Sequence, residues 1–293
     1  MINERQNDDH AIEFNRAAAS AHRAARNVEW LRYTISLILV LASVIFIFLG
    51  DTIRILAVAG FAWAMLSLLA LSPAARARSS EAASVQEYFD TYVYQMKWGE
   101  QTQKVDMERV YELSNSFKGD VLKLRDYYPN VRSFAPPVAI LICQRSNLTW
   151  DIMLRRRWKK FVLTVLLSWL ALGIVVGLAE NLSTWDLIQR WYAPSLGAIS
   201  LGWEIIRAQN STLSEKLALK ARVSAEIDWS GAALTPKQQE RLSASARVIQ
   251  DGILDVRMKS TRVPQFFYDR YRDADDKNMK SAVLAFEKGV GVY

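Results

Sequence analysis

The chain has little of the residues on which catalytic and metal chemistry most often depend. One cysteine, Cys143, and two histidines, His10 and His22, occur among its 293 residues. A single cysteine forms no internal disulfide, so nothing in the sequence requires an oxidising compartment. Zinc sites, Ser-His-Asp triads and Cys-His dyads need more ligands or bases than this set provides. We therefore expect neither a metal site nor an enzyme activity.

Glycine and proline are also scarce, with 12 and 7 residues, which argues against collagen-like and low-complexity chains. No alternating pattern of convincing length predicts a β-strand. The mean hydropathy of 0.00 is typical of a soluble protein, yet it averages nearly uncharged stretches with segments dense in charge. The sequence predicts an all-α polytopic membrane protein whose cytoplasmic helical domain is built from the central and C-terminal segments.

Four stretches low in charge predict four transmembrane helices, at residues 33–50, 55–75, 161–179 and 187–206. At 1.5 Å rise per residue, the first stretch covers about 27 Å, close to the thickness of the hydrocarbon core. The fourth stretch differs from the others because it includes Arg190 and Glu204. A re-entrant or interfacial segment is the competing interpretation there, since charge at membrane depth is costly.

Lysine and arginine are distributed unevenly about these spans. The two short connections, residues 51–54 and 180–190, hold two basic and three acidic residues, so the rest of the +7 chain carries +8. The positive-inside rule then places both termini in the cytoplasm. The predicted parts are an N-terminal helix (1–32), a transmembrane hairpin (33–75), a central cytoplasmic block (76–160), a second hairpin (161–207) and a C-terminal cytoplasmic region (208–293).

The cytoplasmic segments carry helical patterns with recognisable start signals. Ser84 with Glu87 resembles a capping box, and Thr235, Pro236 and Gln238 form a second. No glycine or proline interrupts the chain from Val138 into the third span, which predicts one continuous helix. Helices are expected over residues 84–98, 106–117, 120–128, 138–179, 211–227, 235–258 and from 264 onward.

Polar and aromatic residues are most concentrated in two stretches, 125–128 and 143–155. Arginine binds phosphates bidentately, aromatic rings stack on bases, and amides hydrogen-bond base edges. The alternative is structural: Arg145 pairs with Asp151 or Asp126, and Trp150 is a core residue or membrane anchor. The candidate ligand-binding residues are Arg125, Tyr127, Tyr128, Gln144, Arg145, Asn147, Trp150, Asp151 and Arg155.

Small residues and one charged pair mark the spans. Pairs four residues apart allow close helix approach, within one subunit or between subunits. Glu204 and Arg207 are the candidate pore mouth, with an interfacial snorkelling pair as the alternative, and Pro194 and Gly197 allow the fourth span to bend. The small pairs are Gly173 with Gly177, Gly60 with Ala64, and Ala198 with Gly202.

Five strings recur together in one known family: Arg5-Gln6-Asn7, Gln86-Glu87, Met96-Lys97-Trp98, Asp126-Tyr127-Tyr128 and above all Cys143-Gln144-Arg145-Ser146-Asn147 with Trp150-Asp151. Over residues 2–272 the chain resembles the SMODS-associated four-transmembrane effector family. The resemblance implies an anti-phage role in bacterial cyclic-oligonucleotide signalling (CBASS). The effector would sense a cyclic di- or trinucleotide, made by a linked cyclic-nucleotide synthase, and permeabilise the inner membrane as a homo-oligomer, without cofactor or DNA.

Two further interpretations stay open on the residues alone. The +8 cytoplasmic side attracts a polyanionic messenger, but the cluster from Arg155 to Lys160 equally suits membrane lipid. A membrane-tethered scaffold with no pore, which binds a protein partner through the same cytoplasmic helices, is the alternative function.

Overall fold

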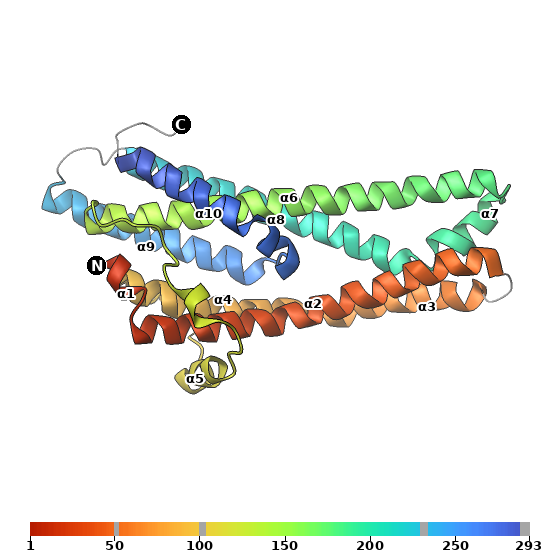
Figure 1. Cartoon of the computed structure of the whole chain (residues 1–293), viewed down its shortest axis with the longest axis horizontal. Coiled ribbons are helices and arrows are strands. Elements are labelled where there is room, and N and C mark those ends of the chain that lie inside the picture. Colours follow the sequence, from red (N-terminus) through yellow and green to blue (C-terminus); the bar gives the residue numbers. More distant parts are fainter. Residues whose placement is uncertain (50–52, 100–103, 229–233, 288–293) are drawn as a thin grey trace.

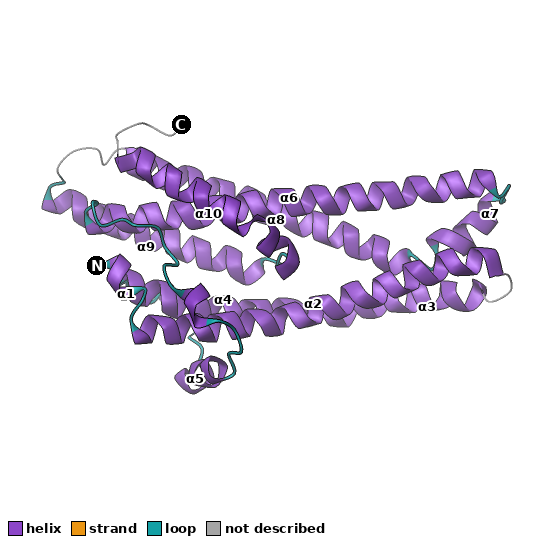
Figure 2. Ribbon diagram, viewed as in Figure 1, coloured by secondary structure: helices purple, strands orange, loops and turns teal. Residues whose placement is uncertain are grey.

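The structure is a computed structural model that describes residues 1–49, 53–99, 104–228 and 234–287. These residues form helices and loops, with no strand among them, so the all-α prediction is confirmed (Figure 2). The molecule is long and narrow (Figure 1). The start of the chain and the end of its last helix lie at one end, and the C-terminal end of α2 (Asp9–Leu49) and helix α7 (Thr184–Leu187) lie at the other.

Four helical rods run along this length. The second rod consists of three elements in direct succession, with a π-helical turn, η1, between two α-helices. The first and second rods pack together, as do the third and fourth. The rods are α2 (Asp9–Leu49), α3 (Ile53–Leu66) with η1 (Ser67–Leu71) and α4 (Ser72–Tyr94), α6 (Pro136–Ala179), and α8 (Leu196–Asp228).

Shorter elements complete the wider end of the molecule. Helix α9 packs against α4, α6 and α8, whereas α10 packs chiefly against α6. Thr235 caps α9 and Gln238 completes the capping box, as predicted. The remaining elements are α1 (Ile2–Arg5), α5 (Met107–Asn115), the 3₁₀ turn η2 (Val121–Leu124), α7 (Thr184–Leu187), the π-helical turn η3 (Ile188–Tyr192), α9 (Pro236–Lys259) and α10 (Gln265–Glu287).

Two of the rods contain helices that could cross a membrane. Among the described residues, the helices Ile55–Tyr94 and Pro136–Ala179 are long and apolar enough to cross a membrane. The large apolar side chains of residues 163–178 are extensively exposed on α6. Such a surface suits contact with lipid chains better than contact with water.

Two predicted helices of the central block differ in the structure: the one expected over residues 84–98 is helical to Tyr94 but begins earlier, and the one expected over 120–128 is replaced by a 3₁₀ turn. Ser84 starts no helix, because it lies buried within α4, whose alanine-rich turns continue from η1 without a break. Residues 120–128 form only the 3₁₀ turn η2. The backbone leaves the helical path at Arg125, which is extended (φ −77°, ψ 159°), and Asp126 follows with a left-handed φ of 50°. Side chains near the N-terminus hold the segment after it.

The fourth apolar segment is broken in its middle. Its first part ends with η3, residues 193–195 form turns, and α8 begins at Leu196. Pro194, predicted to let the segment bend, lies at this break. Proline provides no backbone N–H, so the helical hydrogen bond that residue 194 would donate is lost, which accounts for the interruption.

Glycines fit the broken segment against the other rods. A Cβ at Gly60 would lie 2.6 Å from the backbone oxygen of Ala193, and one at Gly173 would lie 2.6 Å from the Trp191 ring. Gly177 faces Leu187 and Gly197 faces Trp63 in the same way. These small residues therefore serve packing within one chain, which was one of the two roles that the sequence left open.

We expect Gly60→Ala to destabilise the protein by about 1–3 kcal/mol, because overpacking against backbone atoms forces the helices apart. Thermal unfolding in detergent measures the effect. Gly202→Ala is the matched control, since a Cβ there meets Leu166 at an ordinary 3.7 Å. Equal melting temperatures for the two variants would contradict the packing described above.

Candidate functional site

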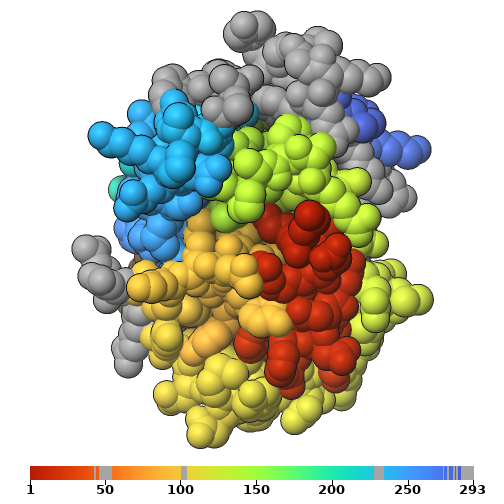
Figure 3. Space-filling view, turned by 90° about the vertical axis from the view of Figure 1, so that its left-hand side faces the viewer, coloured from red at the N-terminus to blue at the C-terminus, as the bar shows by residue number. Residues whose placement is uncertain are grey.

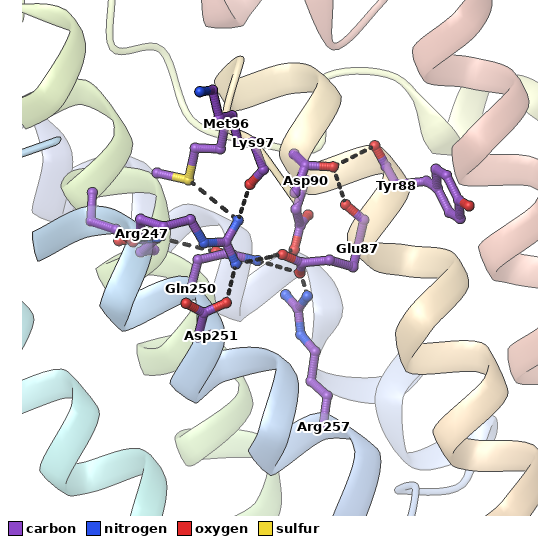
Figure 4. Close-up of polar contacts among 12 residues, drawn as sticks. Glu87, Tyr88, Asp90, Met96, Lys97, Arg247, Gln250, Asp251 and Arg257 are labelled. Carbon is purple, nitrogen blue, oxygen red and sulfur yellow. Dashed lines mark hydrogen bonds and ion pairs between the residues drawn. The ribbon is translucent and has the colours of Figure 1, made fainter. Parts of the chain in front are cut away.

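A network of buried polar side chains joins α4 to α9 (Figure 4). Asp90 accepts hydrogen bonds from Arg257 (2.5 Å), Gln250 (3.0 Å) and the hydroxyl of Tyr128 (2.5 Å). Glu87, one turn earlier on α4, accepts from Gln250 (2.7 Å) and Arg247 (3.0 Å). The network therefore ties the second rod, through its carboxylates, to α9 and to the loop that precedes α6.

The carboxylates of Glu87 and Asp90 lie close together in this network. Burial and the neighbouring charge of Asp90 raise the pKa of Glu87 to about 7. The pKa of Arg257 is raised, since Asp90 and the adjacent tyrosines outweigh the effect of burial. Sequence reasoning missed Arg247, Gln250 and Arg257. The available signal was their spacing of three and seven residues on α9, which places polar groups on an otherwise buried face.

The N-terminal string holds the loop at residues 126–131 in place. Asn7 and Asp126 exchange two hydrogen bonds, of 2.8 and 2.9 Å. Gln6 accepts from the backbone N–H of Tyr128 at 2.6 Å and donates to its carbonyl at 3.3 Å. Figure 3 shows the N-terminal residues, in red, beside the end of α4 and the segment before α6. Gln6 and Asn7 of the resemblance string thus clamp this loop, whereas Arg5 donates to the carbonyl of Val93 on α4 (2.6 Å).

The predicted ligand residues of α6 fall into two groups. Gln144 and Arg155 are buried. Gln144 donates to the carbonyl of Ala246 (2.9 Å) and to Gln250 (3.1 Å), which places it beside the network of α4 and α9. Arg155 pairs with Asp151 (2.5 Å) and donates to Gln209 (2.9 Å). These side chains are occupied within the protein.

Asp151 is held between two cations. Lys216 of α8 lies 2.9 Å from its carboxylate, opposite Arg155. Burial acts to raise the pKa of Asp151, but the charges of Arg155 and Lys216 hold it below its usual range. Burial in turn lowers the pKa of Lys216 to about 8, against the attraction of Asp151. Asp151 thus has the structural role that the sequence offered as the alternative to ligand binding. Its partners are Arg155 and Lys216, whereas the expected partner was Arg145.

The second group lines a pocket of ≈ 120 Å³ between α6 and α10. The hydroxyl of Thr149 and the indole N–H of Trp150 are buried there without a hydrogen-bond partner among the described residues. Arg145 donates to Ser224 at 2.9 Å, and the Trp150 ring contacts Tyr268 edge-on at 4.7 Å. The lining residues are Arg145, Ser146, Thr149, Trp150, Met153, Asn278 and Met279.

The other predicted ligand residues lie outside this pocket's lining. Tyr128 is buried against Phe89, with ring centroids 5.9 Å apart. Tyr127 is 37% exposed and accepts a hydrogen bond from Gln86. Arg125 is exposed and Asn147 is half-buried. The structure therefore brings Arg145 and Trp150 to one pocket and does not gather all nine predicted residues there.

A cluster of charges lies where the first, second and fourth apolar segments begin or end. Arg32 is 1% exposed and pairs with Glu204 of α8 and with Glu29 (3.3 Å). It also donates to Ser67, the first residue of η1, at 3.0 Å. The predicted pairing of Glu204 with Arg207 is wrong. Glu204 faces α2 and the start of α4, where its partners are Arg32 on α2 and Ser72 and Arg76 on α4, and Arg207 is exposed.

No group of three His, Cys, Asp or Glu side chains able to hold a metal ion occurs among the residues that the structure places. The thiol of Cys143 is buried in the core, and burial raises its pKa above the usual range. A buried thiol with a raised pKa is a poor nucleophile.

The family described as the SMODS-associating 4TM effector domain matches residues 1–286. The chain belongs to this family. A curated protein of Bacillus cereus (strain VD146), a probable CBASS effector molecule, is 25% identical over 286 residues, which cover 94% of this chain and 95% of that protein. No solved structure matches this 4TM effector. The match places the N-terminal clamp, the α4–α9 network and the α6 pocket all inside the family domain.

We expect Asp90→Asn to destabilise the 4TM effector by about 3–5 kcal/mol, because it leaves the buried charge of Arg257 unpaired. Thermal or denaturant unfolding measures the loss. Asp255→Asn is the control on an exposed pair, with Lys259 at 2.6 Å, and should cost less than about 1 kcal/mol. A similar cost for both variants would show that the buried pair does not join α4 to α9 energetically.

Proposed function

We propose that this 4TM effector spans the bacterial inner membrane four times, senses a cyclic di- or trinucleotide through its cytoplasmic helices, and permeabilises the membrane. Membership of the effector family supports a role in anti-phage defence. In this proposal the protein is no enzyme, requires no cofactor, acts as a homo-oligomer, and takes its signal from a linked cyclic-nucleotide synthase. Both termini lie in the cytoplasm.

The observation that carries the proposal is the continuity of the rods. Helices α2, α6 and α8 each run from an apolar part into the polar bundle, and α3, η1 and α4 do so in succession. Helix α6 alone has 44 residues, a length of about 66 Å. A displacement of the rods at the cytoplasmic end is therefore carried into the membrane without a flexible link.

The pocket between α6 and α10 supports ligand binding by Arg145 and Trp150. An arginine beside an indole offers a phosphate contact and a stacking face, and two buried polar groups there await partners. Its ≈ 120 Å³ is well below the roughly 300 Å³ at which pockets for drug-sized ligands begin. A cyclic dinucleotide therefore enters only when α10, which contributes Asn278 and Met279, moves away from α6. Binding would thus favour a displaced α10, which is the differential affinity that switching requires.

Liposomes that contain the purified protein should release an entrapped dye only when a cyclic oligonucleotide is added. Arg145→Ala and Trp150→Ala should abolish both release and nucleotide binding, because they remove the phosphate contact and the stacking face. A panel of cyclic di- and trinucleotides, with dye release and calorimetry as readouts, measures this.

Arg222→Ala is the matched control, since Arg222 is exposed on the neighbouring helix α8. Its dye release should equal that of the unaltered protein. Leakage that is indifferent to every nucleotide would remove the receptor from the proposal. Nucleotide binding without leakage would instead favour the scaffold that forms no pore.

The charge cluster around Glu204 provides a test of how the closed state is held. Glu204→Gln weakens the contacts from α8 to Arg32 and Arg76, so half-maximal dye release should require roughly tenfold less nucleotide, a coupling of ordinary size. Glu215→Gln on the same helix is the control, because Glu215 accepts a hydrogen bond from Ser211 one turn earlier on α8. An unchanged or higher nucleotide requirement for Glu204→Gln would show that these pairs do not restrain the membrane helices.

A further inference from the structure

A small pocket lies between α2 and the connection from α9 to α10. Arg26 lies on one side and Arg262 on the other, with Glu29, Trp30, Tyr33, Val263 and Pro264 completing the lining. Its volume of ≈ 10 Å³ admits at most one water-sized group, and the surface inside it is mostly apolar. A phosphate group would therefore lie at the mouth of the pocket.

The two arginines lack carboxylate partners among the described residues. Arg262 contacts the ring of His22 at 3.2 Å, and its Nε atom is buried without a hydrogen-bond partner. The pKa of His22 is lowered, chiefly by burial, so this ring does not compensate the charge. Glu29, the acid in the lining, is paired with Arg32. The nearby carboxylate of Asp269 is exposed and accepts from Gln265.

The burial of Arg262 makes its charge costly in the absence of an anion. Burial, followed by the charge of Arg155, lowers the pKa of Arg262 to about 9. Burial and repulsion from Arg23 also lower the pKa of Arg26. An anion placed between the two guanidinium groups would favour their charged forms and so raise both pKa values.

Aromatic side chains place this pocket at the level of the lipid headgroups. Trp30 is 44% exposed and Phe266 is 51% exposed, and their rings lie 6.1 Å apart beside the pocket. Phe267 contacts Phe161, where the apolar part of α6 begins, with ring centroids 5.8 Å apart. Exposed tryptophan and phenylalanine at this depth are typical of the boundary between hydrocarbon and headgroups.

We propose that Arg26 and Arg262 bind the phosphate of an anionic phospholipid headgroup from the cytoplasmic leaflet. The exposed rings of Trp30 and Phe266 beside the pocket suit the glycerol and upper acyl chain of a lipid, whereas a nucleotide from the cytosol would have to lie against them. The site uses different residues from the Arg145 pocket. The lipid site rests on the part of the proposed function that places the chain in a membrane. It does not depend on nucleotide sensing.

The test uses the full chain in phosphatidylcholine nanodiscs. Dihexanoyl phosphatidylglycerol should raise the melting temperature, and native mass spectrometry should detect it bound. The variant with Arg26→Gln and Arg262→Gln should bind it roughly tenfold more weakly, the loss expected when charge-assisted hydrogen bonds disappear. Inorganic phosphate, dihexanoyl phosphatidylcholine and a cyclic dinucleotide are the comparison ligands, and each should bind this site more weakly.

The matched control removes the same charge from two exposed positions outside the pocket, with Arg222→Gln on α8 and Arg270→Gln on α10. It should bind phosphatidylglycerol as the unaltered protein does. If the double variant fails to fold, Arg26→Gln alone decides, because Arg26 has no polar contact to lose among the residues described. Equal weakening by the control pair, or an effect of the inorganic phosphate or nucleotide alone, would overturn the lipid site. Dye release is not a readout here, so failure of the lipid site is distinguishable from failure of the pore.

Discussion

The contact of Asp90 with Arg257 is the interaction on which the wider, polar end of the molecule depends. It joins α4, which continues the second apolar rod, to α9, and the same carboxylate receives Tyr128 from the loop before α6. Three segments far apart in the chain therefore meet at one carboxylate. A buried carboxylate is stable only when it is paired or hydrogen-bonded. If one of the three segments moved alone, Asp90 would therefore stay buried with a partner missing.

This dependence explains why the resemblance strings lie where they do. Glu87 and Asp90 supply the acids, Gln144 bonds to Gln250 of α9, and the N-terminal clamp fixes the loop that carries Tyr128. Most of these residues contact one another and not an open surface. The family pattern is accordingly, in large part, a pattern of assembly, and Arg145 and Trp150 differ because they line the small α6–α10 pocket.

The sequence predicts the helical class, the long α6 and the cap of α9 well, because each depends on neighbouring residues. Uncharged stretches and the absence of proline can be read from a short piece of sequence without knowing what packs against it. The false start at Ser84 has the opposite cause. Its capping pattern is also local, but Glu87 is engaged by Arg247, 160 residues away, and the helix continues through. Likewise Arg145 and Arg155 lie on one helix, and only the packing of α8 and α9 decides which of them is buried.

The π-helical turn at Ser67–Leu71 gives the second rod an unusual freedom. Such a turn holds one residue more than an α-helical turn, and each residue of an α-helix corresponds to a rotation of about 100°. If that residue were taken up into regular helix, α4 would swivel about its own axis relative to α3 while the rod stayed intact. The hydrogen bond from Arg32 to Ser67 lies at the start of this turn. In the second rod, α4 can therefore rotate about its own axis relative to α3 at the π-helical turn near the membrane surface. This motion needs no bending of the rod.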